Sequence, residues 1–166
     1  MPEFQTVFGS LDQYEKGHVE IIDDEVKHYV FSNIFEVAAG AAPYQKTAVA
    51  RNLDFVIEAI RAEGTSPWMA APHDEFVVVM DGQVQVELVK LDRPEEVAPP
   101  AREGTVPVPG EPAGKRMGRI HLGRGHQALL PAGCAYRFQA QSPSVMIQQT
   151  LRGELTAERW NEICLH

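Results

Sequence analysis

Apolar and polar residues alternate in several stretches of the chain after residue 51, which is the period of a β-strand with one buried face. The clearest case is "EFVVVMDGQVQVEL", where two strand-like runs flank Asp81-Gly82, a dipeptide typical of tight hairpin turns. Short strand-like runs separated by glycine, proline or serine also occur at 119–122, 127–130, 136–140 and 145–150. Many short strands with regular turns predict an all-β sandwich or barrel.

The stretch "RNLDFVIEAIRAEG" fits two kinds of element. Its apolar residues recur at helical spacing between Leu53 and Ile60, but Leu53, Phe55 and Ile57 also alternate as they would on a strand. A glycine-containing turn at residues 64–67 follows, and the next strand begins at Glu75. We therefore predict a strand for this stretch.

Helices are predicted near both ends of the chain. The stretch "DDEVKHYVFSNIFEVAAG" has apolar residues at helical spacing, and either Asp23 or Asp24 is the expected N-cap. The stretch "TAERWNEICLH" predicts a short C-terminal helix capped by Thr156. The fold class expected is therefore a β-barrel with an N-terminal helical segment and a short C-terminal helix.

Prolines and glycines dominate residues 93–117, which rules out a helix or a central strand there and predicts a long irregular loop. Loops of this length tend to be lids, interfaces or disordered segments. Strand signals resume after it, so we predict a single domain over residues 1–166. Within it, 1–50 is an N-terminal extension, 52–150 is the barrel and 155–166 is a tail.

Charge and composition limit the kinds of binding partner and the cellular compartment that we expect for this chain. The formal net charge of −8, with no basic cluster, makes nucleic acid and anionic membranes poor partners. The first residues lack the features of a signal peptide, and no apolar run is long enough to cross a bilayer. Cys134 and Cys164 are expected to be free thiols. Together these features predict a cytoplasmic protein.

Two stretches resemble the motifs of the cupin superfamily. The first runs from Gly64 to Gly82 and contains Glu75, and the second is "GHQALLPAGCAYRFQA", with Pro131-x-Gly133 before Tyr136. The resemblance covers roughly the C-terminal two-thirds of the chain, and it implies a cupin-type jelly-roll barrel. In metal-binding cupins, two histidines and a glutamate of the first stretch and a histidine of the second surround a divalent metal.

The expected ligand positions depart from that pattern. Met69 and Ala71 stand where the first two histidines are expected, and Tyr136 replaces the third, while Glu75 remains. Methionine and alanine offer nothing useful to a hard divalent ion, so we predict no metal in this chain.

Two alternatives stay open for the remaining polar residues. On a regular strand, His73 and Glu75 would face the same side and, with Tyr136, could form an unusual metal site. In the simpler alternative, these side chains hydrogen-bond to one another, and Pro72 breaks the strand. Trp68 could line a pocket or an interface, although core packing is the more frequent role. Five positions are thus candidates for a pocket or a vestigial metal site: Trp68, Met69, His73, Glu75 and Tyr136.

A closer resemblance runs over most of the chain. The stretches "GSLDQYEKGHVEIIDDEVKHYVFSNIFEVA", "RNLDFVIEAIRAEGTSPW" and "HDEFVVVMDG" are similar to the small subunits of two-component hydroquinone 1,2-dioxygenases. The resemblance implies an α2β2 heterotetramer in which a larger catalytic subunit holds Fe(II) and cleaves hydroquinone with O2 to 4-hydroxymuconic semialdehyde, an extradiol-type reaction.

The resemblance further implies that this chain carries no catalytic residue and no cofactor. Two other functions remain possible from the residues alone. One is a stand-alone cupin metalloenzyme with a rearranged site, and the other is a metal-free cupin that binds a small molecule.

Overall fold

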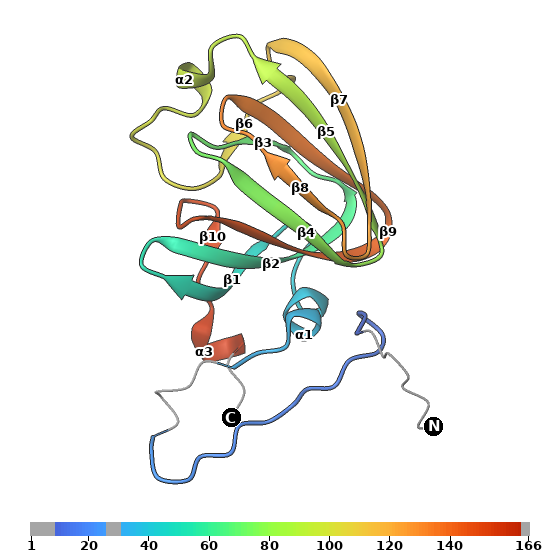
Figure 1. Cartoon of the computed structure of the whole chain (residues 1–166), viewed down its shortest axis with the longest axis vertical. Coiled ribbons are helices and arrows are strands. Elements are labelled where there is room, and N and C mark those ends of the chain that lie inside the picture. The colour runs from blue at the N-terminus through green and yellow to red at the C-terminus, as the bar shows by residue number, and fades with distance from the viewer. Residues whose placement is uncertain (1–8, 26–30, 164–166) are drawn as a thin grey trace, which may run out of the picture.

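A computed structural model describes residues 9–25 and 31–163 of the chain. Within them the chain forms a curled β-sheet that closes into a barrel, with short helices at its ends (Figure 1). The elements are α1 Ile34–Ala39, β1 Lys46–Asn52, β2 Phe55–Thr65, β3 Trp68–Ala70, β4 Glu75–Asp81, β5 Gln83–Leu91, α2 Pro94–Val97, β6 Val106–Val108, β7 Gly114–Gly123, β8 Gln127–Leu130, β9 Cys134–Leu151, β10 Thr156–Ala157 and α3 Trp160–Ile163. The all-β barrel predicted from the alternating pattern is therefore confirmed.

Strand β9 organises the barrel because it pairs with strands on both of its edges. It lies antiparallel to β2 and β3 along one edge and to β4 and β5 along the other. Strand β1 pairs with β2, β8 with β4 and β7 with β5, so most of the remaining sheet is built outward from these four neighbours. The side chains of β2, β4, β5 and β9 that point inward form the main core.

The division of β9 into two strands, 136–140 and 145–150, is wrong. The strand is continuous over 18 residues, and Pro143 lies within it. The register with β2 shifts here, because Ala62 faces Ser144 whereas Gly64 faces Ala140. Residues 141–143 therefore bulge out of the ladder, where a proline without an N–H costs no ladder hydrogen bond.

One local prediction is confirmed and one is wrong. Residues 55–64 of the ambiguous stretch form strand β2, whereas Arg51 and Asn52 belong to β1. Strands β4 and β5 follow each other at Gly82 but do not pair as a hairpin, because β4 pairs with β8 and β9 whereas β5 pairs with β7 and β9. The chain still turns sharply at Gly82, whose φ of +79° favours glycine. Space at the turn excludes a larger residue as well, since a Cβ atom at Gly82 would lie 2.2 Å from Oγ of Ser144.

Both predicted helices are shorter than expected. Residues 23–25 and 31–33 are not helical, and the N-cap of α1 is Asn33 rather than Asp23 or Asp24. The Asn33 side chain accepts hydrogen bonds from the backbone N–H groups of Phe35 and Glu36. At the other end, Thr156 lies in β10 and does not cap α3. Residues 26–30 and Cys164 lie outside the described residues.

The proline-rich segment 93–117 is packed against the barrel. The prediction that it contains no helix is wrong for α2, which accommodates Pro94 in its first turn, where proline is tolerated. Strand β6 pairs with β3 at the end of the sheet, a place where Pro107 does not interrupt a central ladder. Val106 and Val108 bury their side chains in a second apolar cluster together with Trp68.

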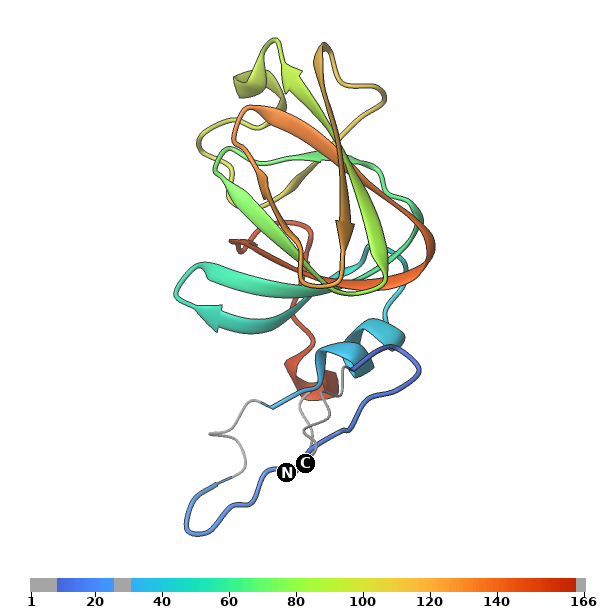
Figure 2. The same ribbon diagram turned by 45° about the vertical axis from the view of Figure 1, so that its right-hand side comes forward.

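The helices α1 and α3 lie at one end of the barrel, and α2 with its loop lies at the opposite end (Figures 1 and 2). Residues 9–25 run as an extended arm beyond α1 and α3. In the part of the chain that the structure describes, no helix is long and apolar enough to cross a membrane.

Candidate functional site

Glu75 and Tyr136 meet inside the barrel, at the two cupin positions that still carry a polar group. Glu75 opens β4 and Tyr136 lies on β9, and each side chain is almost fully buried. The Tyr136 hydroxyl donates a hydrogen bond of 2.6 Å to Oε2 of Glu75. The Thr105 hydroxyl donates one of 2.6 Å to Oε1. Hydroxyl donors therefore engage both carboxylate oxygens.

A chain of buried polar groups continues from this pair across the interior. Nε2 of Gln148 donates to the Tyr136 hydroxyl at 2.9 Å. On the other side of the same amide, Oε1 accepts a hydrogen bond of 2.8 Å from Nζ of Lys46. That ammonium group also contacts Oε2 of Glu58 at 3.3 Å, and Oε1 of Glu58 accepts from Thr156 at 2.8 Å. The network therefore links segment 93–117, through the barrel, to the C-terminal strand β10.

Burial shields this network from water. The side chains of Lys46 and Glu58 are 2% and 1% exposed, so their ion pair is shielded from water. Burial raises the pKa of the Tyr136 hydroxyl well above its ordinary value, and the adjacent Glu75 carboxylate raises it further. Tyr136 is therefore a neutral hydrogen-bond donor near pH 7 rather than a phenolate ligand.

The other predicted site residues do not join this pair. Met69 lies opposite Tyr136 on neighbouring strands and packs in the main core. Trp68 points to the other face of β3, into the second apolar cluster, where the Arg137 guanidinium lies 4.5 Å above its ring. Its Nε1 is buried and has no hydrogen-bond partner among the described residues.

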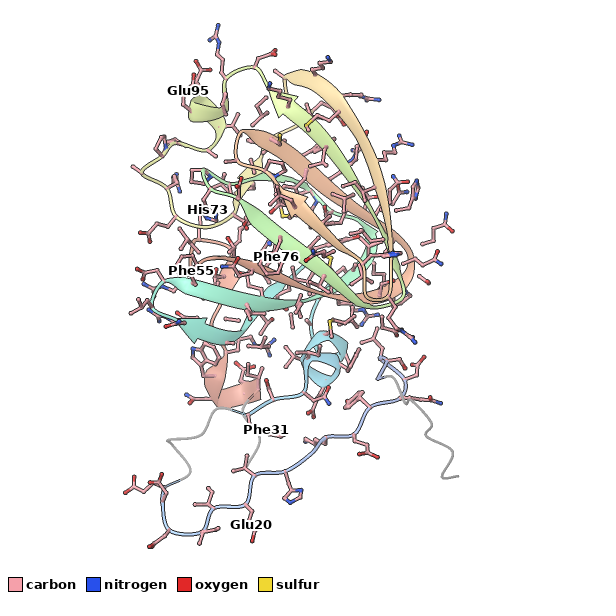
Figure 3. All side chains as sticks on the ribbon, in the orientation of Figure 1. Glu20, Phe31, Phe55, His73, Phe76 and Glu95 are labelled. Atoms are coloured by element: carbon pink, nitrogen blue, oxygen red, sulfur yellow. The ribbon has the colours of Figure 1, made fainter. Side chains whose placement is uncertain are left out.

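His73 lies in the segment between β3 and β4 (Figure 3) and does not hydrogen-bond to Glu75. Its Nδ1 is 3.1 Å from the backbone oxygen of Asp74. Residues 71–74 are not a strand, so the alternation that would point His73 and Glu75 the same way does not hold. Pro72, which cannot donate to a ladder, lies within this break. Of the unusual metal site and the hydrogen-bonded arrangement, the structure has the second, with a hydrogen bond between Glu75 and Tyr136 in which His73 takes no part.

The residues at the cupin metal position do not fit a divalent metal. Both Glu75 oxygens already accept short hydrogen bonds, and Met69 offers a thioether where imidazole is expected. The charged group nearest in the network is the Lys46 ammonium, which would repel a cation. Within residues 9–25 and 31–163, no three His, Cys, Asp or Glu side chains are grouped so that they could hold a metal ion.

Sequence reasoning missed Lys46, Glu58, Thr105 and Gln148. A signal existed for Glu58, because it shares the parity of Val56 and Ile60 on β2 and therefore points into the core. Nothing in the local sequence marks Lys46 or Thr105, because their partners lie 12 to 102 residues away along the chain.

Comparison with solved structures relates nearly the whole chain to one kind of enzyme. The chain is 55% identical to a chain of hydroquinone 1,2-dioxygenase PnpCD in complex with Cd²⁺ and 4-hydroxybenzonitrile, covering 99% of this chain and 98% of that one with a TM-score of 0.94. It is 53% identical to a chain of hydroquinone 1,2-dioxygenase from Sphingomonas sp. TTNP3 with 4-hydroxybenzoate bound, with 98% of each chain covered and a TM-score of 0.96.

A second, longer kind of chain in PnpCD shares the fold. The structure with Fe³⁺ contains a chain that aligns over 82% of the present chain but only 37% of its own length, at 9% identity and a TM-score of 0.63. No protein-family model matches the sequence, and neither does any curated protein sequence. The near-complete match at more than half identity nevertheless settles the relationship. The chain belongs to the small subunits of two-component hydroquinone 1,2-dioxygenases, a family of the cupin superfamily.

Proposed function

We propose that this chain is the non-catalytic, metal-free subunit of a two-chain, Fe(II)-dependent dioxygenase. The enzyme cleaves hydroquinone with O2 to 4-hydroxymuconic semialdehyde, and the larger subunit holds the iron. The observation that carries the proposal is the hydrogen bonding of Glu75, whose two oxygens are taken by Thr105 and Tyr136 at the cupin metal position. Because each of its oxygens already accepts a hydrogen bond from a hydroxyl, this buried carboxylate does not need a metal to satisfy it.

The relatives support the substrate class. Their structures hold 4-hydroxybenzonitrile, 4-hydroxybenzoate or 4-nitrophenol, each of which is a phenol with a substituent para to the hydroxyl, as hydroquinone is. They also hold Cd²⁺ or Fe³⁺. These ligands belong to enzymes with a longer chain beside the short one, which is consistent with a partner subunit here.

The role of this chain in the enzyme is structural. Its barrel is rigidly cross-linked by the polar network, and we propose that it completes and stiffens the larger subunit in an α2β2 assembly. A stiff neighbour stabilises the arrangement of residues that binds substrate, because a well-supported site loses less freedom on binding. The five positions Trp68, Met69, His73, Glu75 and Tyr136 then serve packing and hydrogen bonding rather than catalysis.

Expression of the larger subunit with and without this chain tests the proposal. We expect ring cleavage in the assembled enzyme and little soluble activity from the larger subunit alone. Metal analysis of the separate subunits is expected to find iron with the larger one. Full activity of the larger subunit alone would refute the structural role. Stoichiometric iron in this chain, lost in a His73→Ala variant, would instead support a stand-alone metalloenzyme.

A further inference from the structure

The outer face of the sheet formed by β1, β2, β9, β4 and β8 contains three neighbouring rows of uncharged residues. One row of paired residues crosses all five strands, and we call it the outer row. It consists of Ala50, Ile57, Gln149, Phe76 and Leu129. The two flanking rows of the same face are Asn52, Phe55 and Leu151 on one side and Thr47, Ala59, Ile147, Val78 and Gln127 on the other.

This composition is unusual for a surface in water. Charged residues make up 23% of the chain, so thirteen positions would hold about three of them on average, whereas these three rows hold none. Charge returns to this face in the next row, with Arg61, which forms an ion pair with Glu63. The inner face of the same sheet carries Glu58 and Gln148 among the apolar side chains of the main core. Large apolar side chains grouped on the outer face as well indicate that protein covers this face.

The barrel's own helices cover only part of this face. Helix α1 packs against β2, and Ala59 and Thr47 are fully buried. Beyond α1 the large apolar side chains stay exposed: Phe55 by 54%, Ile57 by 37%, Phe76 by 39% and Leu129 by 56%. Figure 3 labels Phe55 and Phe76, which lie on the two strands that flank β9.

The exposed area and its shape fit the centre of a protein interface. At about 200 Å² for a large side chain, these four residues expose on the order of 400 Å², roughly half of the ~800 Å² that each partner contributes to a stable complex. Two hollows extend the surface: one of about 460 Å³ at Val49, Arg51 and Trp160, and one of about 210 Å³ between Phe55 and Gln149. Such hollows beside exposed aromatic residues can receive anchoring side chains.

We propose that the outer row is the centre of the contact with the larger dioxygenase subunit, and that the occupant is a matching uncharged sheet face of that subunit's own cupin-fold region. This inference rests on the proposed function. The longer chain of the relatives contains the same fold, so it possesses a sheet equivalent to this one. Packing of two such sheets would bury the exposed phenylalanines at the centre of the interface.

Charge substitutions on the outer row test the inference in the full two-chain enzyme. We expect Phe76→Glu and Leu129→Glu each to weaken binding of the larger subunit by about 100-fold, because the interface would bury an unpaired carboxylate. The matched control is Met117→Glu on β7, where the side chain is 52% exposed but lies on a different part of the sheet. It should bind as the unmodified chain does, and all three isolated variants should melt as that chain does.

Oxidative footprinting of the unmodified chain gives a second measurement that does not depend on the folding of variants. Phe55 and Phe76 should be protected in the complex but reactive in the free chain, and Met117 should react in both. Equal binding by all three variants, or unprotected phenylalanines in the complex, would overturn the inference while leaving the proposed function intact. A homodimer of this chain that Phe76→Glu dissociates would also overturn it. Failure of the unmodified chain to bind the larger subunit would instead refute the proposed function.

Discussion

Tyr136 and Glu75 lie 61 residues apart in the sequence and share a hydrogen bond of 2.6 Å inside the barrel. The bond joins the two cupin motifs at the place where a metal joins them in other members of the superfamily. Because Thr105 supplies the second donor, the carboxylate is satisfied without any cation. The polar residues left in the barrel therefore stabilise the fold, and several measurable consequences follow.

Removal of the Tyr136 hydroxyl should destabilise the chain. In Tyr136→Phe, Oε2 of Glu75 loses its donor in a buried site, so we expect the free energy of unfolding to fall by about 1–3 kcal/mol. Urea unfolding of the isolated chain measures this change. Tyr44→Phe is the control, because the Tyr44 side chain is only partly buried and its hydroxyl donates to the backbone oxygen of Gly64, so this change should cost about 1 kcal/mol or less. Equal losses in the two variants would contradict the importance of the buried carboxylate.

The buried ion pair of Lys46 and Glu58 should be sensitive to loss of one partner. We expect Lys46→Met to reduce the free energy of unfolding by about 3–5 kcal/mol, since it leaves the Glu58 carboxylate buried without a cation. The double variant Lys46→Met/Glu58→Leu should recover most of this loss, although Oε1 of Gln148 still lacks its donor.

An exposed pair provides the matched comparison. Arg93 and Glu96 are 3.0 Å apart, with side chains 71% and 61% exposed, so Arg93→Met should cost less than about 1 kcal/mol. Thermal or urea unfolding of all four proteins gives the comparison. A small effect of Lys46→Met, similar to that of Arg93→Met, would show that the buried pair contributes little.

Alkaline pH should destabilise the barrel through two tyrosines. Burial raises the pKa of Tyr44 to about 12 and that of Tyr136 still more clearly above its ordinary value. Because both folded-state pKa values exceed the unfolded value of about 10, their contribution to stability is complete below pH 10 and is lost as the pH rises through the folded values. For Tyr44 this window is about pH 10 to 12.

Phenolate absorbance and circular dichroism, recorded together during an alkaline titration, measure this effect. Tyr136 should ionise only when the barrel unfolds, and Tyr136→Phe should show a shallower loss of stability above pH 10. Ionisation of Tyr136 near pH 10 in a folded barrel would contradict the buried environment described for it.

Two glycines of segment 93–117 allow the energetic cost of backbone strain to be measured apart from the cost of steric crowding. Gly104 and Gly110 have φ values of +71° and +69°, but a Cβ at Gly104 would lie 2.6 Å from the oxygen of Leu151, whereas Gly110 has open space. Gly110→Ala should therefore cost about 1–2 kcal/mol from strain alone. Gly104→Ala should cost clearly more, and it should expose the segment to proteases by displacing Thr105. Similar losses for both would contradict a tight contact at Gly104.

Local patterns predict the elements of this chain better than they predict its interior. Strand β2 and the turn at Gly82 follow from spacing and turn chemistry, which act over a few residues. The predicted hairpin pairing is wrong, because β4 and β5 each pair with β9 instead of with each other. The helix start was misplaced because Asp23, Asp24 and Asn33 are all acceptable caps, and tertiary packing selects among them. Lys46 looks like a surface residue until β1, β2 and β9 are brought together, so no local pattern reveals the network.

The position of β9 in the chain has a consequence for synthesis. Strands β2, β3, β4 and β5 all precede it and all need its edges, so the barrel cannot close on the ribosome until residues 134–151 have emerged. Until then, β3, β4 and β5 lack their partner strand β9, and chaperones can bind their exposed apolar residues. Translation that stops or pauses before Cys134 therefore leaves an open sheet with unpaired edges, which is prone to aggregate.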